Sequence, residues 1–158
     1  MKKLNKILIY LFVTIFFACS TPKQKEFERI EKYFKEVHNF IIDDKIDKII
    51  VITEGTGCPT CDNTFSKTVL DYSKNANTIF LVSATGKFID IQPFLNIEKN
   101  CFFDCEFNRE EYPEFANTSV IFLKNNTVDT TIIIKSELLP EQLEYIESRN
   151  YEKNNKQK

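Results

Sequence analysis

Apolar residues recur every three or four positions from about Gln24 to Phe40, and charged residues fill the positions between them. The apolar positions of this stretch are Phe27, Ile30, Phe34, Val37 and Ile41. Such spacing lines one side of an α-helix with an apolar stripe. We expect an amphipathic helix whose stripe packs against a sheet, with His38, the only histidine, beside the stripe as a partly exposed side chain.

Two uninterrupted apolar runs follow, at Ile49 to Ile52 and at Thr78 to Ser83. Unbroken runs of this length are typical of strands that are covered on both faces of a parallel sheet. A helix is expected between them, ending near Asn75, and its apolar side carries Cys61, Phe65, Val69 and Tyr72. The sequence therefore predicts a right-handed strand-helix-strand unit.

The last third of the chain has the pattern of a hairpin followed by a helix. Ser119 to Leu123 and Val128 to Ile134 are expected to be the two strands of the hairpin, and a Lys124-Asn125-Asn126 turn separates them. A final helix is expected from about Leu138 to Arg149. Residues 84–118 lack a clear period, and we expect a helix over part of Ile97 to Glu111.

The N-terminus has the proportions of an export signal. Three lysines precede an apolar run from Ile7 to Phe17, which is too short for a membrane span. The run ends in Ala18-Cys19-Ser20, which resembles a bacterial lipobox and implies cleavage before Cys19 and attachment of diacylglycerol to its sulfur. The alternative is an ordinary signal peptide or uncleaved anchor that contains a cysteine.

The candidate chemistry lies directly after the first apolar strand, in Cys58-Pro59-Thr60-Cys61. Cysteines three positions apart in a first helical turn lie close enough to close a disulfide ring. Pro59 suits the first turn, where its missing N–H costs nothing. The helix N-terminus favours an anion, so we assign Cys58 as the attacking thiolate and Cys61 as the resolving thiol.

The strand, the Cys-Pro-Thr-Cys turn and the helix after it resemble the active-site region of the thioredoxin superfamily, especially its extracytoplasmic, membrane-anchored bacterial members. The resemblance covers roughly residues 45–150 and implies an α/β fold with a thioredoxin-like central sheet and flanking helices, preceded by a lipoprotein signal peptide. Aligning the Lys124-Asn125-Asn126 turn with the family's Lys-Asn-Gly turn puts Thr118 at the family's cis-proline, a substrate-binding position.

Other departures from the family pattern concern proton transfer and the sequence before the dithiol. Gly57 stands where thioredoxins carry tryptophan, and Ile52 stands where they bury an aspartate that shuttles a proton. Glu54 is the nearest carboxylate along the chain and is a candidate substitute for that aspartate.

The remaining cysteines leave three alternatives open. Cys101 and Cys105 are candidates for a second disulfide, for a redox pair that relays electrons to Cys58 and Cys61, or for reduced buried thiols. In an oxidising compartment cysteines tend to be paired or catalytic. Four thiolates from the two pairs also suit a zinc site, a less favoured interpretation.

Charge and composition limit the classes of partner that the chain is expected to bind. The formal net charge is −2, and loss of residues 1–18, which include three lysines and no acid, makes it −5. No basic stripe is present for phosphates, so nucleic acid is not an expected partner. We expect a signal peptide (1–18), a lipidated tether (19–25), one thioredoxin-like domain (26–150) and a polar tail (151–158).

The expected function is that of a membrane-anchored thiol-disulfide oxidoreductase, working without a cofactor or metal on protein thiols or disulfides. The expected location is the bacterial cell envelope, on its extracytoplasmic side, with a lipid on Cys19 as the link to the membrane. A catalytically inactive thioredoxin-like adaptor lipoprotein is the main alternative.

Overall fold

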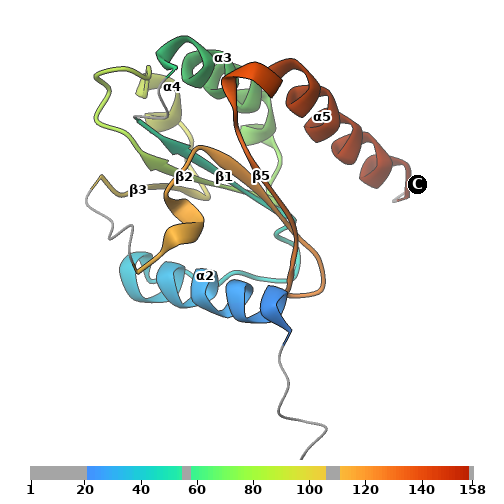
Figure 1. Cartoon of the computed structure of the whole chain (residues 1–158). Helices are drawn as coiled ribbons and strands as arrows, with labels where there is room; N and C mark the ends of the chain where they lie inside the picture. The colour runs from blue at the N-terminus through green and yellow to red at the C-terminus, as the bar shows by residue number, and fades with distance from the viewer. Residues whose placement is uncertain (1–20, 55–57, 106–110, 157–158) are drawn as a thin grey trace, which may run out of the picture.

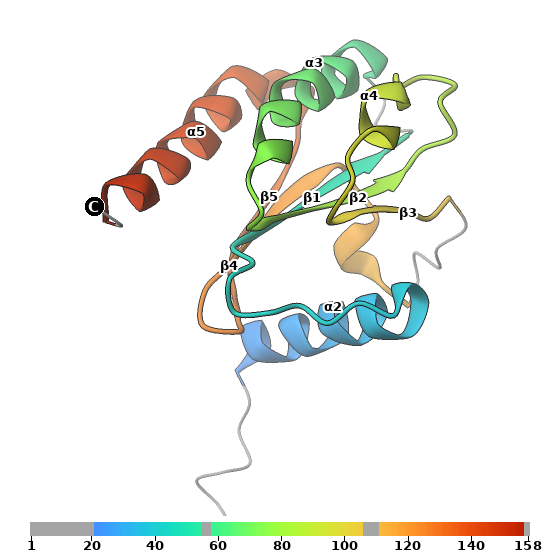
Figure 2. The ribbon, with the colours of Figure 1, turned by 180° about the vertical axis from the view of Figure 1, so that it is seen from behind.

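The computed structural model describes residues 21–54, 58–105 and 111–156, which form a five-stranded mixed sheet with helices on both faces (Figures 1 and 2). The strands are β1 (Lys48–Thr53), β2 (Thr78–Ser83), β3 (Cys101–Phe103), β4 (Ser119–Leu123) and β5 (Val128–Ile133). Their order in the sheet is β3-β2-β1-β4-β5. The fold is therefore of the α/β class, as the sequence predicts.

The central strands are those that the unbroken apolar runs predict. β1 pairs in parallel with β2 over six residues, from Lys48 opposite Thr78 to Thr53 opposite Ser83. On its other side β1 pairs antiparallel with β4, and β4 pairs antiparallel with β5. Each residue of β1, β2 and β4 is buried, which explains why their sequences do not alternate.

Helix α2 (Pro22–His38) covers one face of the sheet, and α3 (Pro59–Val69), α4 (Gln92–Leu95) and α5 (Leu139–Lys156) cover the other (Figures 1 and 2). Three short 3-10 helices complete the fold: η1 (Leu70–Lys74), η2 (Pro113–Phe115) and η3 (Ser136–Leu138). Alternate residues of β1 serve different cores, with Ile49 and Val51 facing α2 and Ile50 and Ile52 facing α3.

Helix α2 confirms the amphipathic pattern but corrects its extent. Thr21 caps its start, and Asn39, at φ 50°, ends it in the left-handed region. The buried residues of the helix are Phe27, Ile30, Tyr33 and Phe34. The prediction that Val37 and Ile41 continue the buried stripe is wrong, because the helix ends at His38 and both side chains are exposed.

The middle of the chain contains the main error in the predicted fold. We expected a helix over part of Ile97 to Glu111, but Cys101–Phe103 is strand β3, which extends the sheet beyond β2 in parallel. The free edge of β2 offers backbone partners to this segment, and pairing with that edge fixes the segment as a strand. Residues 106–110 lie outside the described residues.

The end of the chain follows the prediction with a longer last helix. The hairpin of β4 and β5 turns through Asn125 and Asn126, whose φ values of 52° and 55° are left-handed, and asparagine tolerates this region. α5 continues past the expected end at Arg149 to Lys156. No helix within the described residues has both the length and the apolar character that crossing a membrane requires.

Candidate functional site

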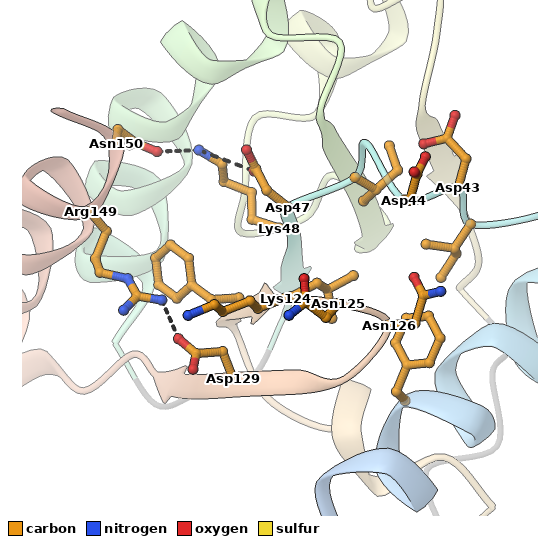
Figure 3. A pocket seen from close by; sticks show the side chains of 15 residues that line it. Asp43, Asp44, Asp47, Lys48, Lys124, Asn125, Asn126, Asp129, Arg149 and Asn150 are labelled. Carbon is orange, nitrogen blue, oxygen red and sulfur yellow. Dashed lines mark hydrogen bonds and ion pairs between the residues drawn. The ribbon is translucent and has the colours of Figure 1, made fainter. Parts of the chain in front are cut away.

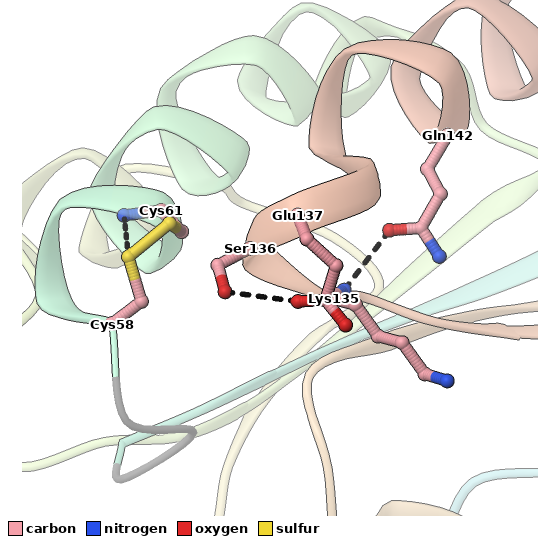
Figure 4. Close-up of a disulfide and its surroundings, with 6 residues drawn as sticks. All are labelled: Cys58, Cys61, Lys135, Ser136, Glu137 and Gln142. Atoms are coloured by element: carbon pink, nitrogen blue, oxygen red, sulfur yellow. Dashed lines mark hydrogen bonds between the residues drawn. A yellow bond between two sulfur atoms is a disulfide. The ribbon is translucent and has the colours of Figure 1, made fainter.

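Cys58 and Cys61 are joined as a disulfide at the start of α3 (Figure 4). Cys58 is the N-cap residue, Pro59 is the first residue of the helix, and the two cysteine Cα atoms lie 5.3 Å apart. The local sequence explains this geometry, since proline is suited to the first helical position and its ring fixes the backbone between the two sulfurs. The structure thus brings together the two residues that the sequence predicts as the redox pair.

The helix start directs backbone donors at Cys58. The backbone N–H of Cys61 donates to Cys58 Sγ over 3.3 Å, and the N–H of Asp62 donates to the Cys58 carbonyl over 3.0 Å. Both cysteines are half-buried, and Cys61 packs against the core beneath α3. A thiolate on Cys58 in the reduced protein would lie at the positive end of the helix with one N–H already aimed at it.

Asp62 is a residue that our sequence reasoning did not select. It follows Cys61 directly, and only 3% of its surface is exposed. Residues four apart on a helix are neighbours on its surface, so Asp62 lies one turn from Cys58. A buried carboxyl group in that position is a candidate proton donor or acceptor for the thiols, and its place immediately after the Cys-x-x-Cys pair is the signal that would have identified it.

The short helix η3, which leads into α5, lies next to the disulfide and carries Ser136 and Glu137 (Figure 4). The Glu137 carboxylate is hydrogen-bonded to Ser136 Oγ at 3.1 Å. Its own backbone N–H and then Ser136 lower the pKa of Glu137, so this exposed group is anionic over a wide pH range. Gln142 accepts from the Lys135 N–H over 2.9 Å and donates to the Ile133 carbonyl over 2.7 Å, which fixes this segment.

Glu54, the candidate substitute for the buried aspartate of thioredoxins, is engaged with a neighbouring loop. Its carboxylate accepts hydrogen bonds from the Thr85 hydroxyl and from the N–H groups of Thr85, Phe88 and Ile89. Burial raises its pKa, but these bonds outweigh burial and hold the pKa at about 2. A carboxylate with this pKa stays ionised at neutral pH, and its hydrogen bonds hold the loop of residues 85–89 against the end of β1.

Thr118 lies immediately before β4, with its side chain turned into the protein. It is fully buried, and its hydroxyl accepts from the Thr53 N–H and donates to the Thr53 carbonyl, both at 3.1 Å. The hydroxyl thus closes the end of the β1–β4 pair. The predicted role of Thr118 in substrate binding stays a prediction, and its side chain is already engaged with the backbone.

Cys101 and Cys105 are free thiols in the structure, so the second disulfide considered from the sequence is absent. Cys101 pairs with Phe80, whereas Cys105 contacts Ala84, four residues further along the neighbouring segment, so the two thiols lie apart, and a disulfide needs Cα atoms within about 7 Å. Burial raises the pKa of Cys101 to about 12, which keeps it protonated. Cys105 is exposed, and its thiol donates to the Ala84 carbonyl over 3.2 Å.

The same spacing weakens the zinc hypothesis. Four thiolates cannot converge on one ion while Cys101 and Cys105 stand far apart and Cys58 is bonded to Cys61. Within residues 21–54, 58–105 and 111–156, no three His, Cys, Asp or Glu side chains gather as a metal site requires. Cys19, the predicted lipidation residue, lies outside the described residues.

His38 belongs to a half-buried chain of polar side chains on the α2 face, whereas the dithiol helix covers the opposite face. Tyr33 donates its hydroxyl hydrogen to Asp104 over 2.7 Å, and His38 Nε2 lies 3.3 Å from the same hydroxyl. The His38 ring also contacts Phe102, with 4.9 Å between ring centroids. His38 therefore joins α2 to β3, and the predicted partly exposed environment is confirmed.

A concave region of about 340 Å³ lies at the opposite end of the sheet from the disulfide (Figure 3). Its most deeply buried charge is Lys48, which is 3% exposed, contacts Asn150 Oδ1 and lies 3.7 Å from Asp47. Arg149 is paired with Asp129 in the same region. These charges bind one another and attach α5 to the sheet.

Comparison of the chain with protein-family models, with curated proteins and with solved structures gives no match in any of the three.

Proposed function

We propose that this chain is a thioredoxin-like, membrane-anchored thiol-disulfide oxidoreductase that works through Cys58 and Cys61. The observation that carries the proposal is the position of Cys58 as N-cap of α3, with its sulfur accepting the Cys61 N–H and bonded to the Cys61 sulfur. A dithiol in this position closes reversibly into a small ring without rearrangement of the helix.

The fold supports the same proposal. A parallel β1-α3-β2 unit followed by an antiparallel β4-β5 hairpin and a last helix is compatible with a thioredoxin-like sheet. The parallel edge strand β3 takes the place where we expected a helix, so membership of the superfamily remains part of the proposal.

The reaction begins with the reduced dithiol. The Cys58 thiolate attacks one sulfur of a substrate disulfide, the substrate S–S bond breaks, and the departing substrate thiolate takes a proton. Cys61 then loses its proton and attacks Cys58 Sγ, which breaks the mixed disulfide and releases the second substrate thiol. Two electrons pass from the cysteine pair to the substrate, and the pair ends as the Cys58–Cys61 disulfide.

Asp62 is our candidate for the group that takes the proton from Cys61. Asp62 follows Cys61 directly in α3, its backbone N–H donates to the Cys58 carbonyl, and its side chain is buried. Proton transfer to a positioned carboxylate accelerates a step of this kind.

The test measures disulfide exchange by the reduced protein on insulin. Wild type should reduce insulin, Cys58→Ser should be inactive, and Cys61→Ser should accumulate a mixed disulfide with the substrate because resolution is blocked. Cys105→Ser is the matched control, since it removes an exposed thiol outside the pair and should leave the rate unchanged. Equal inactivity of wild type and Cys58→Ser would refute the proposal.

The second candidate is an inactive adaptor of the same fold. It is favoured by the state of Thr118, whose hydroxyl is hydrogen-bonded to the Thr53 backbone. Inert wild-type protein that keeps a stable Cys58–Cys61 disulfide would support this alternative.

The membrane anchor is tested separately. Cells expressing the full chain should incorporate a labelled palmitate analogue into the protein, and Cys19→Ala should abolish the labelling and release the protein from the membrane fraction. Labelling that persists in Cys19→Ala would show that the sulfur of Cys19 does not carry the lipid.

A further inference from the structure

The two edges of the sheet differ in how their backbone groups are covered. The Ile134 N–H donates to the Thr118 carbonyl on the inner side of β5. Because successive residues of a strand direct their backbone groups to opposite sides, Asp129, Thr131 and Ile133 turn theirs outward. Lys23 Nζ donates to the Asp129 carbonyl, and Gln142 donates to the Ile133 carbonyl. Side chains thus cover both ends of the β5 edge, which is how proteins prevent edge pairing.

Within residues 21–54, 58–105 and 111–156, by contrast, no side chain is hydrogen-bonded to the outer edge of β3. Asn100 and Asp104 bond to β2 through Phe80 and Val82, so the intervening Cys101 and Phe103 turn their N–H and C=O groups away from the sheet. β3 is the last strand in the order of the sheet, and both figures place it at the outer margin of the fold (Figures 1 and 2). These two residues offer a pair of outward donors and a pair of outward acceptors to another strand.

Exposed apolar side chains flank this edge on both faces. On the α2 face, Val37 is 50% exposed and Ile41 is 70% exposed, next to His38 and Phe40, whose rings contact Phe102. On the α4 face, Leu95 is 54% exposed and Phe103 is 37% exposed. A strand added to β3 would bury side chains on both faces, as central strands of this sheet do.

We propose that the β3 edge is the interface of a symmetric homodimer, in which β3 pairs antiparallel with β3 of a second copy. The register that centres on Phe102 sets Cys101 of each copy opposite Phe103 of the other. Each such pair exchanges two N–H···O bonds, so all the outward groups of both strands are satisfied.

Two features favour a second copy as the occupant over an unrelated extended segment. First, β3 is only three residues long, so strand pairing alone gives few bonds, and a second copy also brings its own Val37, Ile41 and Leu95 to the contact. Second, the twofold axis runs perpendicular to the sheet, so α2 of both copies lies on the same face. Both chains therefore enter their folded domains from the same side of the dimer. This arrangement suits two copies anchored in one membrane, an argument that rests on the proposed lipid anchor.

The first experiment measures the mass of the full chain, purified in a mild detergent, by light scattering over a range of protein concentrations. We expect reversible dimers. Phe103→Pro removes an outward N–H and an exposed ring but keeps the bonds of β3 to β2, and proline is tolerated on edge strands. It should raise the dissociation constant at least about tenfold.

Thr131→Pro is the matched control, because it removes an outward N–H from the other edge strand and should leave the dimer intact. Phe103→Lys is a second disrupting variant that keeps the backbone unchanged, and it should weaken the dimer through its charge. A chain that stays monomeric at every concentration, or equal loss of dimer in Thr131→Pro and Phe103→Lys, would overturn the proposal.

The second experiment tests the register. In a Cys101→Ser, Cys105→Ser background, Phe102→Cys should form a disulfide between copies on mild oxidation, because opposed residues of a non-hydrogen-bonded antiparallel pair have Cα atoms about 4.5 Å apart. Ile133→Cys, exposed on β5, should not cross-link. Cross-linking through Ile133→Cys alone would place the interface elsewhere.

Discussion

The two ends of the sheet both concentrate polar side chains, and they use them differently. At the end where β1 stops, a half-buried disulfide lies at a helix N-terminus, and the Glu54 carboxylate fixes the neighbouring loop. At the end where β1 starts, the charges of the pocket in Figure 3 bind each other, as Lys48 does with Asp47. The first end therefore holds the proposed reactive pair, and the second end holds charges that pair with one another.

The largest expected effect separates the two ends by activity. Cys58→Ser should lower disulfide exchange at least about 1,000-fold, since the attacking sulfur is lost. Insulin reduction measures this effect, and circular dichroism checks that the variant folds. If Lys48→Met at the other end lowered the exchange rate as much as Cys58→Ser does, the proposed division between the ends would fail.

Lys48→Met should instead reduce stability. Lys48 is buried beside Asp47 and Asn150 and lies over the Tyr72 ring, with Nζ 5.0 Å from the ring centroid. Removing one partner of a buried ion pair leaves an uncompensated charge and costs about 3 kcal/mol in the free energy of unfolding. Urea denaturation measures the loss, and Lys124→Met, which changes an exposed lysine at the rim, is the control that should change little.

Glu54→Gln should loosen the loop next to the dithiol without removing the reactive sulfur. We expect about tenfold faster amide hydrogen exchange at Thr85 and Phe88, because a charged acceptor is replaced by a weaker one. The pKa of about 2 adds a pH test. Because folding lowers this pKa, the stability from Glu54 is complete above pH 4.5 and is lost as the pH falls towards 2, and the variant should lack that loss.

Substitution of His38, on the α2 face, should have the smallest effect, and the effect is on the pH dependence of stability. Burial lowers its pKa below 6.5, although Asp104 acts in the opposite direction. Protonation therefore favours the unfolded chain, so stability should decline as the pH falls below 6.5, towards the lowered pKa. Tyr33 and Asp104 are the polar groups that face the ring. His38→Phe should flatten this part of the profile in thermal unfolding, and an unchanged profile would assign the decline to other groups.

Local patterns predicted the elements that carry the candidate site. The unbroken apolar runs located β1 and β2 at nearly their observed bounds, because a strand covered on both faces carries apolar side chains at consecutive positions, with polar residues only at its two ends. The Cys-Pro-Thr-Cys spacing placed Cys58 at a helix start, because proline at the first position and a short side chain before it are local requirements.

Other parts of the site depended on contacts between distant residues. No local period marks Cys101–Phe103 as a strand, because its conformation comes from the free edge of β2. The partners of Glu54 lie more than thirty positions away in the chain, so the sequence could not distinguish a loop clamp from a proton carrier. The burial of Asp62 also depends on distant residues, since it is set by the segments that pack over the first turn of α3.

The sequence by itself determined the α/β class, the two central strands and a cysteine pair at a helix N-terminus, because each follows from side chains close together in the chain. The tertiary structure alone decided that Cys101 and Cys105 stand apart as thiols, that Thr118 and Glu54 hold backbone groups, and that β3 forms an edge of the sheet. These features depend on which distant segments come together. The contacts that stabilise them exist only when the sheet has formed.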